Sequence, residues 1–355
     1  MLTALGHEVE VVSRLRTALR SLDETSRLRT YAKAQIQAIC LIQRYRRRRV
    51  RPDLWITYHP YAKAPDLLGP LVAMALELPY VVIDGTIAYK YRRSSFRDGL
   101  ALTRAALRRC DALFFNKPID QLRAERLVRC PHLYLPPSVD LDRFASALPI
   151  DLSAGAAGPV IGSLAMFRSG RKVDSLKLLA EALEILHERS PDEPWLAVIG
   201  GGGPAREEAL AAFSSLPRNR VRFFGLVPTE DVPAFMKGCD IFAFPGLAEP
   251  LGLVFLEAQA TGLPVVAVRN EGIASVSSPD GTILLNSSRP AAYADALMEL
   301  IADPERRRQM GNTALRFVAM ERSRTVAQAR LAEGLAAAIE HHKLQQVSVQ
   351  PSSAE

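Results

Sequence analysis

The sequence predicts an α/β protein with two doubly wound parallel-sheet domains. Strand-like apolar runs alternate with amphipathic segments of helical length, the pattern of parallel strands joined by crossover helices. The 355 residues, 48% of them hydrophobic, are enough for two ordinary domains with separate cores. A stretch rich in alanine, glycine, serine and proline at 145–160 lies between the two series of strands and has the composition of a linker.

Each half of the chain has its own predicted strands. In the first half they are "EVEVVS" (8–13), "DLWITY" (53–58), "YVVID" (80–84), "ALFF" (112–115) and "LYLPP" (133–137). In the second half they are "VIGSLA" (160–165), "WLAVIG" (195–200), "VRFFG" (221–225), "IFAFP" (241–245), "PVVAV" (264–268) and "TILL" (282–285). The last helical stretches are predicted at about 290–302 and 304–341. These patterns predict an N-terminal domain at 1–148, a linker at 149–159, a second domain at 160–320, a C-terminal helix at 321–341 and a disordered tail at 342–355.

The chain opens on what resembles the end of a helix, stopped at Gly6, leading into the 8–13 strand. A doubly wound domain normally has a strand, a turn and the start of that helix before this point, so we expect an N-terminal strand to be missing. The first 20 residues hold no signal-peptide core, and no apolar run reaches about 18 residues. We therefore expect a cytoplasmic protein.

Charge is distributed unevenly between the halves. Residues 1–150 hold 25 basic and 14 acidic residues, against 20 and 24 in the remainder. The run "RYRRRRVR" (44–51) fits either a solvated helix end before Pro52 or a peripheral contact with an anionic membrane or an acidic acceptor. Nucleic acid is not an expected partner, because no aromatic residues are interleaved with this run and no recognition motif accompanies it.

The four cysteines, Cys40, Cys110, Cys130 and Cys239, lack paired Cys-x-x-Cys spacing. This argues against a disulfide framework and against a structural zinc site. We expect reduced cysteines that serve mainly in packing.

The stretch "EPLGLVFLEAQATGLPVVA" (249–267) predicts a loop, a helix and a strand. Ligands bind beyond the carboxyl ends of strands in an open parallel sheet, so the loop that holds Glu249 belongs at a ligand site. Backbone N–H groups near Gly252, Leu253 and Val254 form a helix N-terminus that suits a diphosphate. Glu257 lies roughly 7–8 Å further along the helix at about 1.5 Å per residue, a distance that fits sugar hydroxyls attached to that diphosphate.

The same stretch resembles the signature of the retaining glycosyltransferases of family 4: a glutamate, seven residues, a second glutamate and Ala-x-Ala-x-Gly-x-Pro-Val-Val-Ala. These enzymes have the GT-B fold, two Rossmann-like domains facing a cleft. Other segments match in the family's order, and the resemblance covers about residues 1–340. They are "LPPSVDLDRF" (135–144), "VIGSLAMFRSGRKVDSLKLLAEAL" (160–183), "AVIGGGGP" (197–204) and "VRFFGLVPTEDVPAFMKGCDIFAFP" (221–245).

The resemblance implies transfer of a hexose-like unit from a nucleoside diphosphate sugar to a carbohydrate or glycolipid acceptor, with retained configuration and without an essential metal or other cofactor. Such a reaction would serve polysaccharide or glycolipid assembly. It places the first glutamate, Glu249, at the transferred sugar as a catalytic residue, and Glu257 at the ribose of the donor.

The resemblance also implies cations at the donor diphosphate, whose charge needs them in a metal-free site. The family's lysine falls on Arg171, beside Lys172, and Arg168 substitutes for an arginine that is replaced by Ser163. The backbone at Leu226 borders the nucleotide base.

This chain departs from the family pattern at several points. Ser275 stands where the family usually has a glutamate, and Asp84 stands where many relatives have a histidine. His59, at the end of another predicted strand, is the candidate that contacts the sugar in its place. The missing first strand would also remove a glycine-rich loop that approaches the donor.

Two motifs resemble functional sites that are not expected here. "DLD" (140–142) lies inside the matched 135–144 segment and is not read as a metal site, and "GGGG" (200–203) lacks dinucleotide-binding spacing, so a dehydrogenase is not expected. Two alternatives to a transferase stay open: a catalytically weak or inactive nucleotide-sugar-binding protein, and a nucleotide-sugar epimerase on the same fold.

Overall fold

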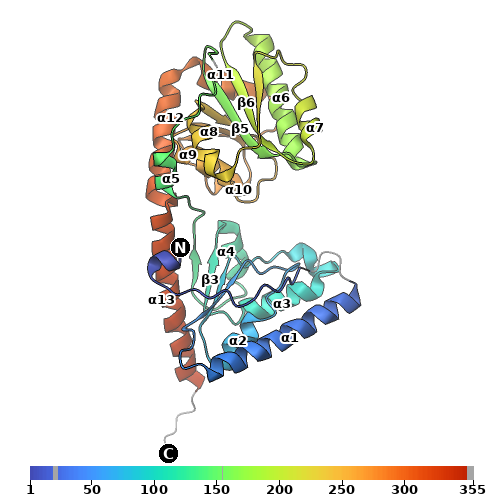
Figure 1. The fold of residues 1–355 in the computed structure, drawn as a ribbon, viewed down its shortest axis with the longest axis vertical. Helices are drawn as coiled ribbons and strands as arrows, with labels where there is room; N and C mark the ends of the chain where they lie inside the picture. The colour runs from blue at the N-terminus through green and yellow to red at the C-terminus, as the bar shows by residue number, and fades with distance from the viewer. Residues whose placement is uncertain (19–22, 154, 350–355) are drawn as a thin grey trace, which may run out of the picture. The chain divides into compact units, whose positions relative to one another are not determined.

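The computed structural model describes residues 1–18, 23–153 and 155–349, and the chain folds into two compact units (Figure 1). Unit 1 comprises Met1–Pro136 together with the chain from Ala327 onward, and unit 2 is Pro137–Val326. In each unit a parallel sheet is packed with helices, as the alternation of strands and helices predicts.

Among the described residues, the sheet of unit 1 has four parallel strands in the order β1-β2-β3-β4. Its strands are β1 (Trp55–Tyr58), β2 (Tyr80–Ile83), β3 (Ala112–Phe115) and β4 (His132–Tyr134). Its helices are η1 (Thr3–Leu5), α1 (Glu24–Arg47), α2 (Gly69–Leu76), η2 (Tyr89–Arg93), α3 (Arg97–Leu107), α4 (Pro118–Ala124) and most of α13 (Arg324–Val349).

The two faces of this sheet pack against different helices because successive strand residues point to opposite sides. Val81 and Phe114 pack against Leu331 and other apolar residues of α13. Val82 and Leu113 belong to a separate core with buried residues of α1, α2 and α3. Both faces are therefore covered, as is usual for a parallel sheet.

The predicted strand at 8–13 is wrong: residues 7–18 form no strand. The carboxylate of Glu10 instead accepts a hydrogen bond of 2.8 Å from the Tyr45 hydroxyl and forms ion pairs with Arg44 and, at 3.2 Å, Arg48. These contacts hold the segment against the C-terminal end of α1. The "RYRRRRVR" run thus has a local acidic partner.

Among the described residues, the sheet of unit 2 has six parallel strands in the order β10-β9-β8-β5-β6-β7. Its strands are β5 (Val160–Met166), β6 (Leu196–Gly202), β7 (Val221–Gly225), β8 (Ile241–Ala243), β9 (Val265–Val268) and β10 (Thr282–Leu285). Its helices are α5 (Leu141–Ser146), α6 (Arg171–Arg189), α7 (Arg206–Ala211), η3 (Thr229–Asp231), α8 (Val232–Lys237), α9 (Leu253–Ala260), α10 (Glu271–Ala274), α11 (Pro290–Ala302), α12 (Pro304–Phe317) and the π-helix η4 (Val318–Arg322).

The boundary between the units differs from the predicted one. It falls at Pro136/Pro137 rather than at 149–159, because α5 packs on unit 2: Phe144 is buried in the unit 2 core. The predicted linker also contributes to unit 2, since Leu152 is buried in the same core.

The C-terminal segment differs as well. The predicted helix at 304–341 is interrupted at Ser323, and α13 continues to Val349, through much of the predicted disordered tail. His341 and His342 each lie 3.1 Å from a carboxylate oxygen of the buried Asp111 in unit 1, which fixes this part of the helix. The rest of the predicted tail, residues 350–355, lies outside the described residues.

The strand order of unit 2 determines where a ligand would bind. The chain builds β5, β6 and β7 outward in one direction and then returns to place β8, β9 and β10 on the other side of β5. The change of direction between β5 and β8 is a topological switch point, where open parallel sheets bind ligands at the carboxyl ends of their strands. Within the described part of the chain, no helix is long and apolar enough to cross a bilayer.

Candidate functional site

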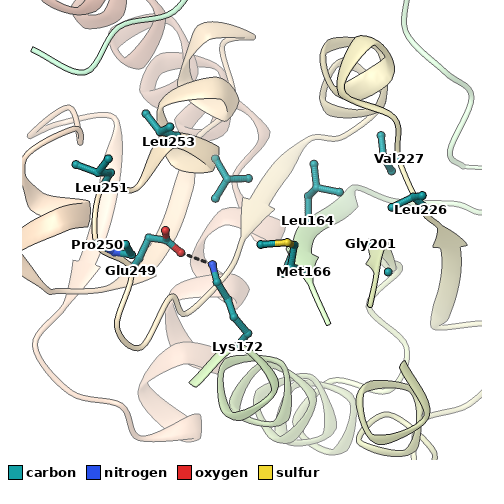
Figure 2. Close-up of a pocket in the computed structure, with 13 residues that line it drawn as sticks. Leu164, Met166, Lys172, Gly201, Leu226, Val227, Glu249, Pro250, Leu251 and Leu253 are labelled. Atoms are coloured by element: carbon teal, nitrogen blue, oxygen red, sulfur yellow. Dashed lines mark hydrogen bonds and ion pairs between the residues drawn. The ribbon is translucent and has the colours of Figure 1, made fainter. Parts of the chain in front are cut away.

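A pocket of about 430 Å³ opens at this switch point in unit 2 (Figure 2). It is lined by the ends of β5 and β6, the segment after β7, the start of α6 and the loop from β8 into α9. The lining residues are Leu164, Ala165, Met166, Lys172, Gly201, Gly202, Leu226, Val227, Glu249, Pro250, Leu251, Leu253 and Val254. Its volume falls in the range of small-molecule and cofactor sites.

Lys172 and Glu249 form an ion pair across this pocket, drawn as a dashed line in Figure 2. Lys172 lies in the first turn of α6, and Glu249 lies in the β8–α9 loop. The ammonium group also lies 5.3 Å from the centre of the Phe244 ring. The lysine side chain is 30% exposed and the glutamate 13%, so both charges are partly removed from water while still reaching the pocket.

The loop that carries Glu249 is held by residues that do not line the pocket. The Leu247 N–H donates to the Ser175 hydroxyl at 3.0 Å, and the Asn270 side-chain amide donates to the Gly246 carbonyl at 2.8 Å. Gly246 has a positive φ of 66°, which glycine adopts without strain.

Gly272 supports the same loop through its lack of a side chain. A Cβ at this position would lie 2.1 Å from the Glu249 carbonyl oxygen, so only glycine allows this approach. Asn270 was not predicted from the sequence as a support of this loop. Its position directly before Glu271, where it caps α10 by accepting from the Ile273 N–H, is the signal that could have found it.

Glu257 lies on α9 and is not among the residues that line the pocket. It is half-buried, and burial raises its pKa, while the positive charge of Arg143 on α5 acts in the opposite direction. Arg143 could not be predicted from the sequence, because only folding brings α5 against α9. The structure therefore supplies one cation near the carboxylate expected at the ribose.

The structure separates the other expected cations from the pocket lining. Arg168 and Arg171 are exposed, and neither lines the pocket, although Arg171 begins α6 directly before Lys172. Ser163 is fully buried in β5. Gly252 is the N-cap residue of α9, with φ 66°, and lies directly before Leu253 in the lining.

His59 lies in unit 1, where it pairs with Asp84. The two residues follow β1 and β2 directly, and His59 Nδ1 lies 2.6 Å from Asp84 Oδ2. Both have left-handed backbone conformations, with φ of 54° and 57°. The hydrogen bond to Asp84 raises the pKa of His59, against the opposing effect of its partial burial.

The "DLD" segment has a structural role in unit 2. Asp140 forms an ion pair of 2.7 Å with Arg324, and the adjacent Val139 forms a β-bridge with Ser323. Among the described residues, no group of three or more His, Cys, Asp and Glu side chains is arranged to hold a metal ion.

The paired parallel sheets and the switch-point pocket define a class: the chain has the GT-B fold. Two solved structures show the likeness across most of the chain. Anabaena HepE in complex with UDP has a TM-score of 0.67 at 20% identity, covering 85% of this chain and 82% of its own. Sucrose-phosphate synthase from Thermosynechococcus elongatus has a TM-score of 0.63 at 19% identity, covering 91% and 83%.

Residues 164–317, which hold the pocket, match the model of the family described as glycosyl transferases group 1. Curated relatives include two D-inositol 3-phosphate glycosyltransferases. That of Corynebacterium urealyticum is 34% identical over 197 residues, 50% of this chain and 45% of the relative. That of Corynebacterium jeikeium is 29% identical over 269 residues, 70% of this chain and 64% of the relative. The chain spans less than two thirds of the length of each.

Proposed function

We propose that this protein is a retaining, metal-independent glycosyltransferase that binds a nucleoside diphosphate sugar in the unit 2 pocket and transfers its sugar to a carbohydrate or glycolipid acceptor. The observation that carries the proposal is the Lys172–Glu249 ion pair at the switch-point pocket. In this pair the Lys172 ammonium group can bind a phosphate, and the neighbouring Glu249 carboxylate can accept hydrogen bonds from sugar hydroxyls. The solved structures of Anabaena HepE in complex with UDP and with UDP-glucose support a nucleotide-sugar donor.

In the proposed reaction the bond between the anomeric carbon and the diphosphate oxygen breaks, and the diphosphate leaves with the electron pair. The acceptor hydroxyl oxygen forms the new bond on the same face of the sugar, and its proton passes to the departing phosphate. Positive charge develops on the sugar and negative charge on the diphosphate. Lys172 and the N–H groups at the start of α9 would stabilise the second charge, and Glu249 would orient the sugar hydroxyls and balance the first.

Other residues are proposed to contact the remaining parts of the donor. Glu257 is proposed to accept hydrogen bonds from the ribose hydroxyls, and the backbone near Leu226 to border the base. Arg168 and Arg171 would add charge at the diphosphate from exposed positions at the start of α6. Neither needs a metal ion to act.

On the acceptor side we propose that His59 contacts sugar, oriented by Asp84. The aspartate fixes the imidazole at Nδ1, which leaves Nε2 available to a ligand hydroxyl. The expected reaction would serve polysaccharide or glycolipid assembly at the cytoplasmic side of a membrane.

The test is transfer of a radiolabelled hexose from UDP-, GDP- and ADP-sugars to lipid and polysaccharide fractions, with the product anomer assigned by NMR. The proposal predicts a product with the donor's anomeric configuration, formed in the presence of a chelator and lost in Glu249→Gln. A product with inverted configuration, or equal product from Glu249→Gln, contradicts it.

One observation favours the alternative of a binding protein without transfer. Ser163 occupies the place of a diphosphate-binding arginine, and it is fully buried in β5. Donor binding without any product, from a sample that binds acceptor as well, would select this second candidate.

A further inference from the structure

Unit 1 contains a second pocket, of about 400 Å³, that the donor site does not use. It lies between α1, α2 and α3, on the side of the four-stranded sheet opposite α13. Tyr31 and Gln35 of α1, Leu71 and Met74 of α2, Leu102 of α3 and Arg109 line it among others. Most of these side chains are apolar, and the groove is open to the surface.

An exposed apolar rim surrounds this groove. Leu28, Tyr31, Gln35 and Ile39 follow one another on α1 at spacings of three or four residues, so they form one stripe along the helix. Leu28, Ile39, Leu71, Met74 and Leu102 are between 36% and 61% exposed. An amphipathic helix of a globular domain normally keeps residues of this kind inside, whereas the core-facing residues of α1 are Ala34, Ala38, Leu41 and Tyr45.

Asp66 lines the groove, and its carboxylate accepts hydrogen bonds from the Tyr80 hydroxyl and the Leu68 and Gly69 N–H groups; the other charges around the groove are mostly positive. Across α1, α2 and the segment 97–109 the sequence has ten basic residues and two acidic ones, Glu24 and Asp98, and Asp98 is paired with Arg27. Arg46 continues the stripe of α1 and donates to the Ala75 carbonyl of α2 at 3.1 Å. Arg46 and Arg109 form no ion pair with any residue in the described ranges, so their charges are open to a ligand.

We propose that this face of α1, α2 and α3 docks on an anionic phospholipid surface, with the apolar rim entering the boundary of the acyl layer and the arginines contacting lipid phosphates. A helix with an exposed apolar stripe and basic flanks lies in a membrane interface in this way. Each basic residue near an anionic leaflet adds electrostatic attraction that salt screens. An acidic protein partner would match the arginines but would not account for five exposed apolar side chains.

The surface differs from the one that the sequence indicated. The 44–51 run is partly neutralised, because Arg44 and Arg48 are paired with Glu10, and its end carries no apolar rim. The proposal concerns unit 1 alone and holds whether or not unit 2 transfers sugar.

The test is flotation of the full chain with vesicles of phosphatidylcholine, with and without 40% phosphatidylglycerol, at low and high salt. We expect binding to the anionic vesicles and none to the neutral ones. Leu28→Ser/Ile39→Ser/Met74→Ser and, separately, Arg46→Glu/Arg109→Glu are each expected to lower the partition coefficient about tenfold or more.

The matched controls change residues of the same kind elsewhere. Leu122→Ser/Leu148→Ser/Met320→Ser removes three exposed apolar side chains, and Arg218→Glu/Arg316→Glu reverses two exposed arginines of unit 2. Both should bind like the wild type. The melting temperature of each variant, and its shift with nucleotide, shows that both units are folded and that the donor site is unaffected.

Three results would overturn the proposal. One is the absence of binding to anionic vesicles by a folded sample. A second is equal loss in the test and control variants, which would show unspecific attraction. The third is a dimer, detected by sedimentation without lipid, that the apolar triple variant abolishes while vesicle binding is unchanged, which would assign the face to a second copy of this chain.

Discussion

Lys172 and Glu249 lie 77 positions apart in the sequence and form an ion pair across the unit 2 pocket. Lys172 lies in the first turn of the helix after β5, and Glu249 lies in the loop after β8; β5 and β8 flank the switch point. A donor diphosphate would attract the ammonium group and its sugar hydroxyls would donate to the carboxylate. We therefore expect donor binding to break the ion pair, with Lys172 contacting the diphosphate and Glu249 contacting the sugar.

Replacing Lys172 should mainly weaken donor binding. A hydrogen bond to a charged group contributes about 1.5–3 kcal/mol, which corresponds to roughly 10- to 100-fold in affinity. Lys172→Met is thus expected to raise the Kd for the donor nucleotide by that factor, measured by titration calorimetry. Lys177→Met, which removes an exposed lysine one and a half turns along the same helix, is the control and should bind normally.

Replacing Glu249 should mainly slow the transfer. Glu249→Gln keeps the shape of the side chain but removes the charge that balances the developing positive sugar. Loss of one such preorganised group costs about 10²–10³ in kcat. Initial rates at saturating donor give kcat, and a Glu249→Gln enzyme with kcat within threefold of the wild type would rule out a role in the transition state.

The stability of the protein should respond to Glu257 in a direction set by its burial. Because burial raises the pKa of Glu257 in the folded state, the folded protein keeps this proton at pH values where the unfolded chain has lost it. The group therefore lowers the free energy of unfolding as the pH rises from the ordinary value of about 4.5 through the folded pKa.

Glu257→Gln removes that effect, so its melting temperature relative to the wild type should be higher at pH 7 than at pH 4.5. The same variant should bind nucleotide more weakly, since an amide cannot accept both ribose hydroxyl protons equally well. Thermal melts at both pH values, with and without nucleotide, measure both effects. If Glu257→Gln binds nucleotide as tightly as the wild type, Glu257 does not contact the ribose, although the pH dependence of stability would still be expected.

Gly272 should tolerate no side chain. The Cβ of Gly272→Ala would meet the Glu249 carbonyl oxygen at 2.1 Å and the Pro250 carbonyl carbon at 2.6 Å, and both are backbone atoms. We expect a cost of about 1–3 kcal/mol in stability and a loss of donor affinity through displacement of the Glu249 loop. In Gly202→Ala the nearest atom would lie at 3.4 Å, so its stability, measured by urea unfolding, should be nearly unchanged.

The His59–Asp84 pair predicts a pH dependence of opposite sign to that of Glu257. The hydrogen bond to Asp84 raises the pKa of His59, so its stabilising effect is present below the unfolded value of about 6.5 and is lost as the pH rises through the folded pKa. Asp84→Asn should lower the pKa of His59, measured by NMR titration, and should reduce the melting temperature more at pH 6 than at pH 9. Equal losses at both pH values would show that the pair contributes no charge interaction.

Much of the fold could be predicted from the sequence because buried parallel strands are continuous apolar runs. β3, β7 and β10 have the predicted boundaries. The boundaries of the other strands differ from the predicted ones by at most two residues, except that β4 ends three residues earlier than predicted. The prediction of a strand at 8–13 was wrong because the alternating valines do not show that Glu10 bonds to Arg44 and Tyr45 of α1. That contact depends on folding. The unit boundary failed because composition indicates flexibility and does not show that Phe144 and Leu152 are buried in the unit 2 core.

The candidate site could be predicted only where its residues are neighbours in the sequence. Local order along the chain places Glu249, Leu253 and Val254 together, and all three line the pocket. Partners that come from distant segments, such as Asn270 for the loop and Asp84 for His59, have no local signature. Sequence spacing also could not show that Arg168 and Arg171 remain exposed outside the pocket lining while Lys172 lies within it.

The proposed function depends on binding of a nucleotide sugar in the unit 2 pocket through Lys172 and Glu249. Its most direct test is titration calorimetry of the wild type and Lys172→Met against UDP, GDP, ADP and their common hexose conjugates. We expect one preferred nucleotide, tighter binding of its sugar conjugate to the wild type, and a loss of 10-fold or more in affinity in Lys172→Met. Binding of no nucleotide by folded protein, or equal affinity in the variant, would contradict it.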